Sequence, residues 1–318
     1  MLAIVKAGAA VLPLAPKDSN SRLQALIEHS ECSLIVASPI QATRIKGLDL
    51  CKQSAGIQIM QIDADAIADC CRARRMPHSS SYAPIAPTLP SDLAYVLFTS
   101  GTSLHSKGMM YTEYTFDNSI EDVFGTLSAG GCIVVPSDAE RANNLLEFCE
   151  VHHVNALHIT PTVLRLHFAQ PSTTSIQLKS LVIGGEPVRD HDLDILRQWA
   201  ALCKDLRAFV AYGSTETCID CIARQVTSSE ALAPVNSIGS PISFLIWQTW
   251  LVSPLTQRLA PVGAQAELYV GGPAVARGYL PSNEVSQTGF LGFQDPFYGK
   301  SVNVEPKDQQ PHIRFPHP

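Results

Sequence analysis

Short apolar runs alternate along this chain with longer segments whose apolar residues recur every three or four positions. The runs are rich in β-branched residues, which predicts strands over 33–38, 57–62, 94–99, 132–136, 156–160, 180–185 and 206–213. The periodicity between them predicts helices over 20–30, 139–151, 162–169 and 189–203. This alternation is typical of an α/β protein built on a largely parallel sheet.

The pattern changes near residue 240. Residues 241–280 hold shorter β-like pieces separated by turns, which predicts a small β subdomain after an α/β core over 1–240. Residues 281–318 are rich in Pro, Gly, Gln and His and show no periodicity, so we predict an irregular, poorly ordered tail.

Composition narrows the classes of partner. The net charge is −6 and no basic run occurs, which argues against a nucleic-acid partner. No segment reaches the roughly 20 apolar residues that cross a bilayer, so no membrane partner is expected. The nine cysteines are scattered, as reduced thiols of a cytoplasmic protein are. Cys218 and Cys221, with His152 and His153, offer an alternative metal or redox site, but neutral thiols are favoured because no second Cys-x-x-Cys follows.

The stretch AYVLFTSGTSLHSKG at 94–108 carries the most distinctive chemistry. A strand-like run ends in small and hydroxyl residues, whose backbone N–H groups and hydroxyls suit an anion, and Lys107 adds a positive charge. The spacing does not fit the Walker loop. No Gly-x-Gly-x-x-Gly follows a predicted strand, which argues against a dinucleotide-dependent oxidoreductase. The candidate phosphate-binding residues are Thr99, Ser100, Gly101, Thr102, Ser103, Lys107 and Gly108.

This loop resembles the phosphate-binding loop of the adenylate-forming, AMP-binding enzymes, and in particular that of the amino-acid-activating adenylation domains of fungal nonribosomal peptide synthetases. The family pattern is Thr-Ser-Gly-Ser/Thr-Thr-Gly-x-Pro-Lys-Gly, and here Leu104 replaces its glycine and Ser106 its proline. Leu104 resists positive φ and adds bulk near the phosphates. Further similar segments follow in the family's order at 6–16, 114–131, 181–187, 211–216 and 266–280.

The resemblance implies the large N-terminal core of an adenylate-forming enzyme, with mostly parallel sheets flanked by helices, a small β subdomain and the C-terminal small domain absent. ATP and Mg²⁺ are the implied cofactors. Lys107 and Glu216 take the catalytic roles, Glu216 holds the Mg²⁺, and Tyr212 stacks on the purine. Implied nucleotide contacts outside the phosphate loop are Gly185, Glu186, Tyr212, Gly213 and Thr215.

The resemblance also implies a substrate pocket in which Asp117 pairs with the α-ammonium group of an amino acid. From the residues alone, Ser119 with Asp122 three positions later also forms a helix-capping box, and both interpretations of this segment stay open. The polarity of the pocket suits a basic or polar substrate side chain. The implied lining residues are Asp117, Asn118, Glu121, His158, Val182, Gly184, Ala211, Ile219 and Asp220.

The implied reaction is formation of aminoacyl-AMP from an amino acid and Mg-ATP in nonribosomal peptide biosynthesis. Expected partners are the amino acid and the carrier or condensation domains of a synthetase, with phosphopantetheine only on a partner carrier domain. Two alternatives stay open: an impaired relic or nucleotide-binding module of the same fold, and an acyl- or aryl-CoA ligase, against which Asp117 argues. The relic is motivated by Leu104, by the absent C-terminal domain and by a link at 109–115 that is much shorter than the family's. The short link is either a real feature of the protein or the result of an incorrectly assembled gene.

Overall fold

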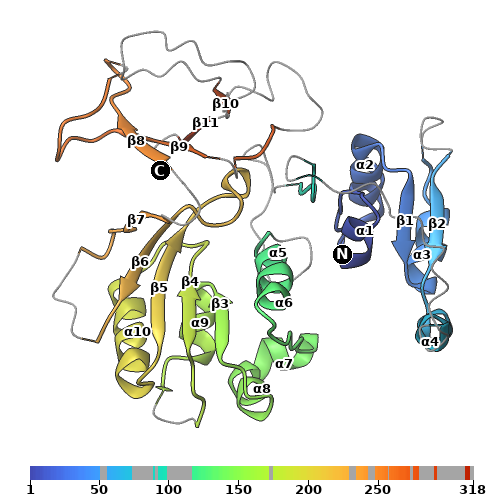
Figure 1. Ribbon diagram of the computed structural model, residues 1–318, viewed down its shortest axis with the longest axis horizontal. Helices are drawn as coiled ribbons and strands as arrows, with labels where there is room; N and C mark the ends of the chain where they lie inside the picture. Colours follow the sequence, from blue (N-terminus) through green and yellow to red (C-terminus); the bar gives the residue numbers. More distant parts are fainter. Residues whose placement is uncertain are drawn as a thin grey trace. The chain divides into compact units, whose positions relative to one another are not determined.

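The computed structural model describes residues 1–50, 56–73, 89, 92–98, 117–171, 175–228, 234–242, 248–256, 258–272, 275–278, 290–291 and 312–315. The chain divides into two compact units, Met1–Phe116 and Asp117–Pro318. Figure 1 follows the ribbon from blue at the N-terminus to red at the C-terminus. None of the helices in the described ranges has the length and apolarity that a bilayer crossing requires.

The first unit holds a two-stranded parallel sheet with its helices. Ser19 begins the second helix by accepting a hydrogen bond from the backbone N–H of Arg22. A small core forms where Ile27, Ile35 and Ile45 meet from two helices and a strand. The elements are α1 (Leu2–Lys6), α2 (Asn20–Ser30), β1 (Leu34–Ala37), α3 (Pro39–Lys46), β2 (Gln58–Gln61) and α4 (Ala64–Ala73).

The second unit carries most of the predicted site residues. Its helical elements are α5 (Asn118–Ile120), the π-helical turn η2 (Glu121–Gly125), α6 (Thr126–Ser128), α7 (Asp138–Asn143), α8 (Leu145–Val151), α9 (Pro161–His167), α10 (Asp190–Leu202) and the 3₁₀ turn η4 (Thr215–Thr217). Its strands are β3 (Ala156–Ile159), β4 (Ser180–Ile183), β5 (Arg207–Tyr212), β6 (Ile222–Val226), β7 (Ser240–Pro241), β8 (Gln248–Val252), β9 (Glu267–Gly271), β10 (Phe290–Leu291) and β11 (His312–Phe315).

A five-stranded sheet in the order β3-β4-β5-β6-β7 organises this unit (Figure 1). The first three strands are parallel, because α9 and α10 provide the crossovers between them, and β6 and β7 are antiparallel. Leu181 and Ile183 are fully buried on one face of the sheet. Helix α10 packs on β5 and β6, and the indole N–H of Trp199 donates to the carbonyl of Phe168 at 2.9 Å. This side of the sheet is the main core.

A second, antiparallel sheet has the order β10-β11-β9-β8. Val270 and Val275 from this region share a hydrophobic cluster with Cys221 and Ile222 of the five-stranded sheet, so the two sheets pack together. Strands β10 and β11 come from the region after residue 281, where the sequence pattern predicts no regular element. The boundary predicted at residue 240 stays a prediction.

Three predicted elements differ from the structure. Of the strand predicted over 94–99, the described residues 94–98 form only an isolated bridge, between Tyr95 and Val11. Residues 132–136 form no strand, and Val135 is 60% exposed, because apolar β-branched residues alone do not supply a pairing partner. The helix predicted over 139–151 breaks at Asn144, whose φ of −132° ends α7 before α8 begins.

Candidate functional site

Three predicted pocket residues share one face of the five-stranded sheet. His158 on β3 is the register partner of Val182 on β4, and Val182 is the partner of Phe209 on β5. Ala211 lies two residues after Phe209, so it points to the same side. The other face is the helix-covered core. The strands therefore bring these side chains together on the face away from α10.

Asp117 begins the helical segment that borders this face. Its carboxylate accepts a hydrogen bond from the N–H of Asn118 at 3.1 Å, and the residue is only 5% exposed. Ser119 lies within α5 rather than at its cap, so the capping box predicted for Ser119 and Asp122 is wrong. Asp117 caps α5 instead. The family resemblance assigns the same carboxylate to the ammonium group of the substrate.

Glu121, His158 and Asp220 form a cluster of hydrogen-bonded and charged groups. Glu121 Oε2 lies 3.2 Å from His158 Nδ1, and Asp220 Oδ2 lies 3.6 Å from His158 Nε2. The side-chain amide nitrogen of Asn118 lies 3.1 and 3.0 Å from the two ring nitrogens. The structure thus joins four predicted pocket residues from α5, η2, β3 and the loop before β6.

The charges in this cluster perturb one another. Burial raises the pKa of Asp220 to about 6, with the negative charges of Glu121 and Asp117 adding to it and His158 opposing it. Burial opposes protonation of His158, but the hydrogen bond that its ring donates to Glu121, together with the nearby carboxylates, outweighs burial and raises the His158 pKa. The hydrogen bond to His158 lowers the pKa of Glu121. These groups behave as one coupled unit.

Asp122 belongs to the same cluster, and sequence reasoning did not place it in the pocket. Burial raises the pKa of Asp122 to about 6, with His158 lowering it and Glu121 raising it. The π-helical turn over Glu121–Gly125 inserts an extra residue into the helix, which changes the direction of the side chains that follow. A π turn within an α-helix is not visible in the hydrophobic pattern, so no sequence signal indicated this residue.

The loop between β5 and β6 positions Asp220. Gly213 has no side chain, and a Cβ built there would lie 1.9 Å from the carbonyl oxygen of Ile219. Cys218 and Ile219 both have positive φ, 53° and 78°, which is costly for a β-branched residue. The buried hydroxyl of Thr217 accepts from the N–H of Ser214 at 3.0 Å and closes the η4 turn. The loop is therefore held tightly against the end of β5.

The same loop brings two predicted nucleotide residues close to Asp117. Burial raises the pKa of Asp117, and the charge of Glu216 raises it further, while hydrogen bonds from Thr215 and Asn118 lower it. The backbone carbonyl of Glu216 accepts a hydrogen bond from the N–H of Ala276 at 2.8 Å, which ties this turn to the segment after β9. A carboxylate oxygen is the hard ligand that Mg²⁺ prefers, so Glu216 fits the predicted metal role.

The ends of β4 and β5 carry the remaining predicted nucleotide contacts. A Cβ on Gly184 would lie 3.0 Å from the carbonyl oxygen of Ala211, so the two strand ends pack closely. Gly185 has a φ of +78°, which glycine adopts without strain. Tyr212 is half-buried against the cluster that includes Cys221 and Val270. These residues lie at the carboxyl ends of parallel strands, where open sheets bind ligands.

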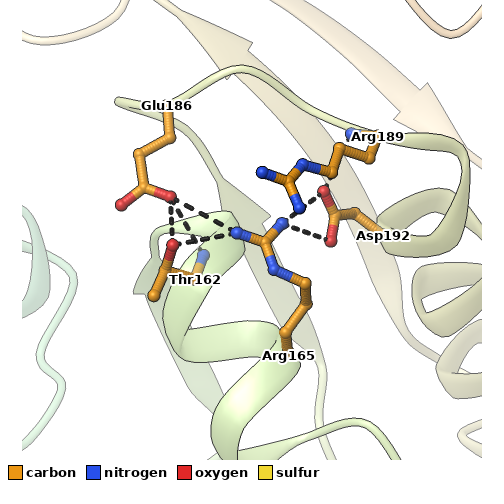
Figure 2. A network of polar contacts seen from close by, with 5 residues as sticks. All are labelled: Thr162, Arg165, Glu186, Arg189 and Asp192. Carbon is orange, nitrogen blue, oxygen red and sulfur yellow. Dashed lines mark hydrogen bonds and ion pairs between the residues drawn. The ribbon is translucent and has the colours of Figure 1, made fainter.

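Glu186 takes part in a network that the sequence did not predict (Figure 2). Its Oε2 accepts hydrogen bonds from the N–H and hydroxyl of Thr162 at 3.1 and 2.6 Å, and Arg165 lies 3.8 Å away. Arg165 Nη1 donates to both oxygens of the fully buried Asp192, at 2.8 and 2.9 Å. This network links α9, α10 and the turn after β4. The predicted contact of Glu186 with the nucleotide stays a prediction.

In the Cys-x-x-Cys pair, Cys221 is a buried thiol and Cys218 is partly exposed. The Cys221 thiol donates to the carbonyl oxygen of Tyr212 at 3.5 Å, and burial raises its pKa to about 11, so it stays neutral at physiological pH. The predicted phosphate loop lies outside the described residues, and its roles stay predictions. That loop comprises Thr99, Ser100, Gly101, Thr102, Ser103, Lys107 and Gly108.

The sheet, the acidic cluster near its carboxyl edge and the family comparison agree. The chain belongs to the AMP-binding enzyme family, whose model matches residues 1–116 and 109–280. The two matched segments overlap at the place where the sequence is shorter than the family pattern. The family resemblance stated from the sequence is therefore confirmed, and with it the class of adenylate-forming ligases.

Among curated proteins, the chain is similar to fungal nonribosomal peptide synthetases. It is 30% identical over 333 residues to the synthetase gloA of Glarea lozoyensis, covering 96% of this chain and 4% of gloA. It is 33% identical over 320 residues to anaPS of Neosartorya fischeri, covering 92% of this chain and 12% of anaPS. The chain thus spans a small part of the length of these relatives.

Solved structures confirm the predicted fold class. The nonribosomal peptide synthetase FmoA3 superposes with a TM-score of 0.70 at 22% identity, covering 97% of this chain and 33% of FmoA3. The adenylation domain AlmE of Vibrio cholerae, solved with glycyl-adenosine-5'-phosphate, gives a TM-score of 0.63 at 17% identity, covering 96% of this chain and 62% of AlmE. At these identities the likeness shows the fold alone.

Proposed function

We propose that this chain activates an amino acid by adenylation within nonribosomal peptide biosynthesis. The substrate carboxylate attacks the α-phosphate of ATP, forming the acyl–phosphate bond of aminoacyl-AMP and releasing pyrophosphate. FmoA3 has been solved with AMPPNP and with α-methyl-L-serine-AMP, and the fungal relatives are named as peptide synthetases, which supports this class of reaction.

The observation that carries the proposal is Asp117. Its carboxylate is buried at the start of α5, beside the sheet face that presents His158 and Val182. A desolvated carboxylate is the natural partner of a bound ammonium group, because each compensates for the water the other loses. A simple carboxylic acid has no ammonium group, so Asp117 argues against an acyl- or aryl-CoA ligase.

The remaining roles follow from the same proposal. Glu216 would hold Mg²⁺, which would supply positive charge next to the phosphates, and Tyr212 and Gly185 would border the nucleotide base. Carrier and condensation domains of a synthetase are the proposed partners, with phosphopantetheine on the carrier domain. A cytoplasmic location is proposed from the cysteine usage, since six of the cysteines are free thiols: Cys32, Cys132, Cys149, Cys203, Cys218 and Cys221.

Amino-acid-dependent exchange of pyrophosphate into ATP tests the proposal. We expect exchange with at least one amino acid, and Asp117→Ala should lower it at least 100-fold, because the substrate ammonium loses its partner. Asp138→Ala on the surface of α7 is the control and should leave exchange unchanged. Undiminished exchange by Asp117→Ala would contradict the proposed anchoring role.

The alternative of a non-catalytic nucleotide-binding module is motivated by Leu104 in the phosphate loop. Calorimetry with Mg-ATP separates it from the enzyme. An active domain binds ATP and exchanges pyrophosphate, whereas a nucleotide-binding module binds ATP without exchange, and a relic with a blocked loop binds neither.

A further inference from the structure

The side chains around His158 include more carboxylates than one imidazole balances. Glu121, Asp122 and Asp220 all act electrostatically on His158. Glu121 and Asp220 lie 3.2 and 3.6 Å from its two ring nitrogens. Even a protonated His158 supplies one positive charge against three carboxyl groups. Another cation would complete this group of charges.

The cluster is buried at one end and open at the other. The side chain of His158 is 8% exposed and that of Asp220 is 17% exposed, whereas that of Glu121 is 55% exposed. A molecule from solvent can therefore reach the cluster past Glu121 without unfolding the sheet. The charges on the buried side are poorly screened by water, so a cation there is bound more strongly than on an open surface.

The spacing of the ligand atoms suits an organic cation. Atoms from Glu121, His158 and Asp220 lie within 4.8 Å of one another. One tetrahedral ammonium that donates two hydrogen bonds of about 2.8 Å spans acceptor oxygens about 4.6 Å apart. The planar donors of a guanidinium group span a similar pair of acceptors. A single cationic group therefore bridges two of these carboxylates.

The arrangement is less suited to a metal ion, although these residue types are metal ligands. Glu121 faces Nδ1 of His158 and Asp220 faces Nε2, on different sides of the ring. A metal binds through one ring nitrogen, so bringing both carboxylates to that ion breaks the contact at the other nitrogen. An organic cation can instead bridge carboxylate oxygens while the imidazole keeps both neighbours.

We propose that this pocket selects α-amino acids whose side chain ends in an ammonium or guanidinium group. The proposal rests on the proposed function: Asp117 takes the α-ammonium group, and the cluster of Glu121, His158 and Asp220 takes the second cation. It narrows the basic or polar side chain expected from the sequence to a positively charged one. Specificity arises because a neutral side chain leaves the carboxylates uncompensated.

Calorimetric titration of the full chain tests this selection directly. L-Lysine, L-ornithine and L-arginine are compared with L-norleucine, L-norvaline and L-citrulline, which are neutral and have the same number of side-chain methylene or methyl carbons before the terminal group. We expect at least one basic amino acid to bind at least tenfold more tightly than its neutral counterpart. Glu121→Gln and Asp220→Asn should each reduce that preference about tenfold, because each removes one carboxylate charge.

Asp194→Asn is the matched control. It removes the same charge from an exposed position on α10, where Asp194 pairs with Arg197, and it should leave the preference unchanged. Circular dichroism establishes that each variant is folded. The comparison of lysine with norleucine on the unmodified chain stands even where a variant does not fold.

Absent binding, equal binding, or tighter binding of the neutral amino acids would overturn the proposal. The proposal would also be overturned if the chain bound Zn²⁺, if Glu121→Gln abolished that binding, and if basic amino acids were not preferred. Pyrophosphate exchange reports on the proposed function separately. Selective binding without exchange supports the pocket and refutes the catalytic activity, whereas exchange that prefers neutral amino acids does the reverse.

Discussion

Two groups of carboxylates in the second unit differ in how fully their charges are compensated. The first group is the network around Arg165 (Figure 2). There the buried Asp192 accepts two hydrogen bonds from the guanidinium group of Arg165, and Glu186 accepts a hydrogen bond from Thr162. In the His158 cluster, burial and mutual repulsion raise the pKa of Asp220 to about 6. The first group is compensated within the protein, and the second is compensated only in part.

The difference indicates separate roles. A compensated buried ion pair holds elements together, and here it fixes α9, α10 and the turn after β4 to one another. An uncompensated cluster costs folding free energy, and such a cost is typical of sites that bind a ligand or carry out chemistry. Substitutions in the two groups should therefore change stability in opposite directions.

The largest expected effect comes from Arg165→Met. This change leaves the fully buried Asp192 without its cation, and we expect a loss of about 3–5 kcal/mol in the free energy of unfolding. Denaturant unfolding followed by circular dichroism measures it. Arg72→Met is the control, because Arg72 and Asp69 are each 72% exposed, and it should cost less than about 1 kcal/mol. A similar small cost for both variants would contradict a structural role for the network.

Gly213→Ala should have the next largest effect. The added Cβ would meet the carbonyl oxygen of Ile219 at 1.9 Å, so the loop that carries Asp220 must move. We expect a loss of about 2–3 kcal/mol in stability together with weaker binding of basic amino acids. Gly56→Ala, where a Cβ meets nothing within 4 Å, is the control. Unchanged binding in a folded Gly213→Ala protein would show that the loop does not position the pocket.

Asp220→Asn should have a smaller effect of opposite sign. The pKa of Asp220 is about 6 in the folded chain against 3.8 for the free group, so the folded state disfavours the ionised carboxylate. Stability linked to this group falls as pH rises from about 4 to about 6 and stays low above that. Removing the charge should therefore stabilise the unliganded protein by about 1–2 kcal/mol at pH 7.5.

Thermal unfolding at two pH values measures this gain. At pH 7.5 the variant should unfold at a higher temperature than the unmodified chain. Near pH 3 the gain should largely vanish, because Asp220 is then mostly protonated in both states. Destabilisation at pH 7.5 would mean that Asp220 is compensated within the protein, as Asp192 is.

Much of the fold could be predicted from the sequence because its signals are local. The alternation of short strands and amphipathic helices places β3, β4, β5 and α10 correctly, and Pro161 begins α9 at the first helical position. Strand pairing is not local. Residues 132–136 have strand composition but form no strand. The strand β11 alternates polar and apolar residues over only four positions, too short a run to identify a strand by itself, and it pairs with β9.

The candidate site divides in the same way. The resemblance to the family named four of the clustered residues as pocket residues, so their proximity could be predicted from the sequence. They are Asp117, Glu121, His158 and Asp220. Asp122 and Arg165 could not, because a π-helical turn and a contact between two helices bring them into place. Neither the π-helical turn nor the contact between the helices can be recognised from the pattern of hydrophobic and polar residues.

The most direct test of the account is a crystal structure of the chain grown with L-lysine. The account predicts the side-chain nitrogen within about 3 Å of carboxylate oxygens of Glu121 and Asp220, and the α-ammonium group at Asp117. A lysine side chain directed away from His158, or a metal ion held by Glu121 and Asp220, would contradict it.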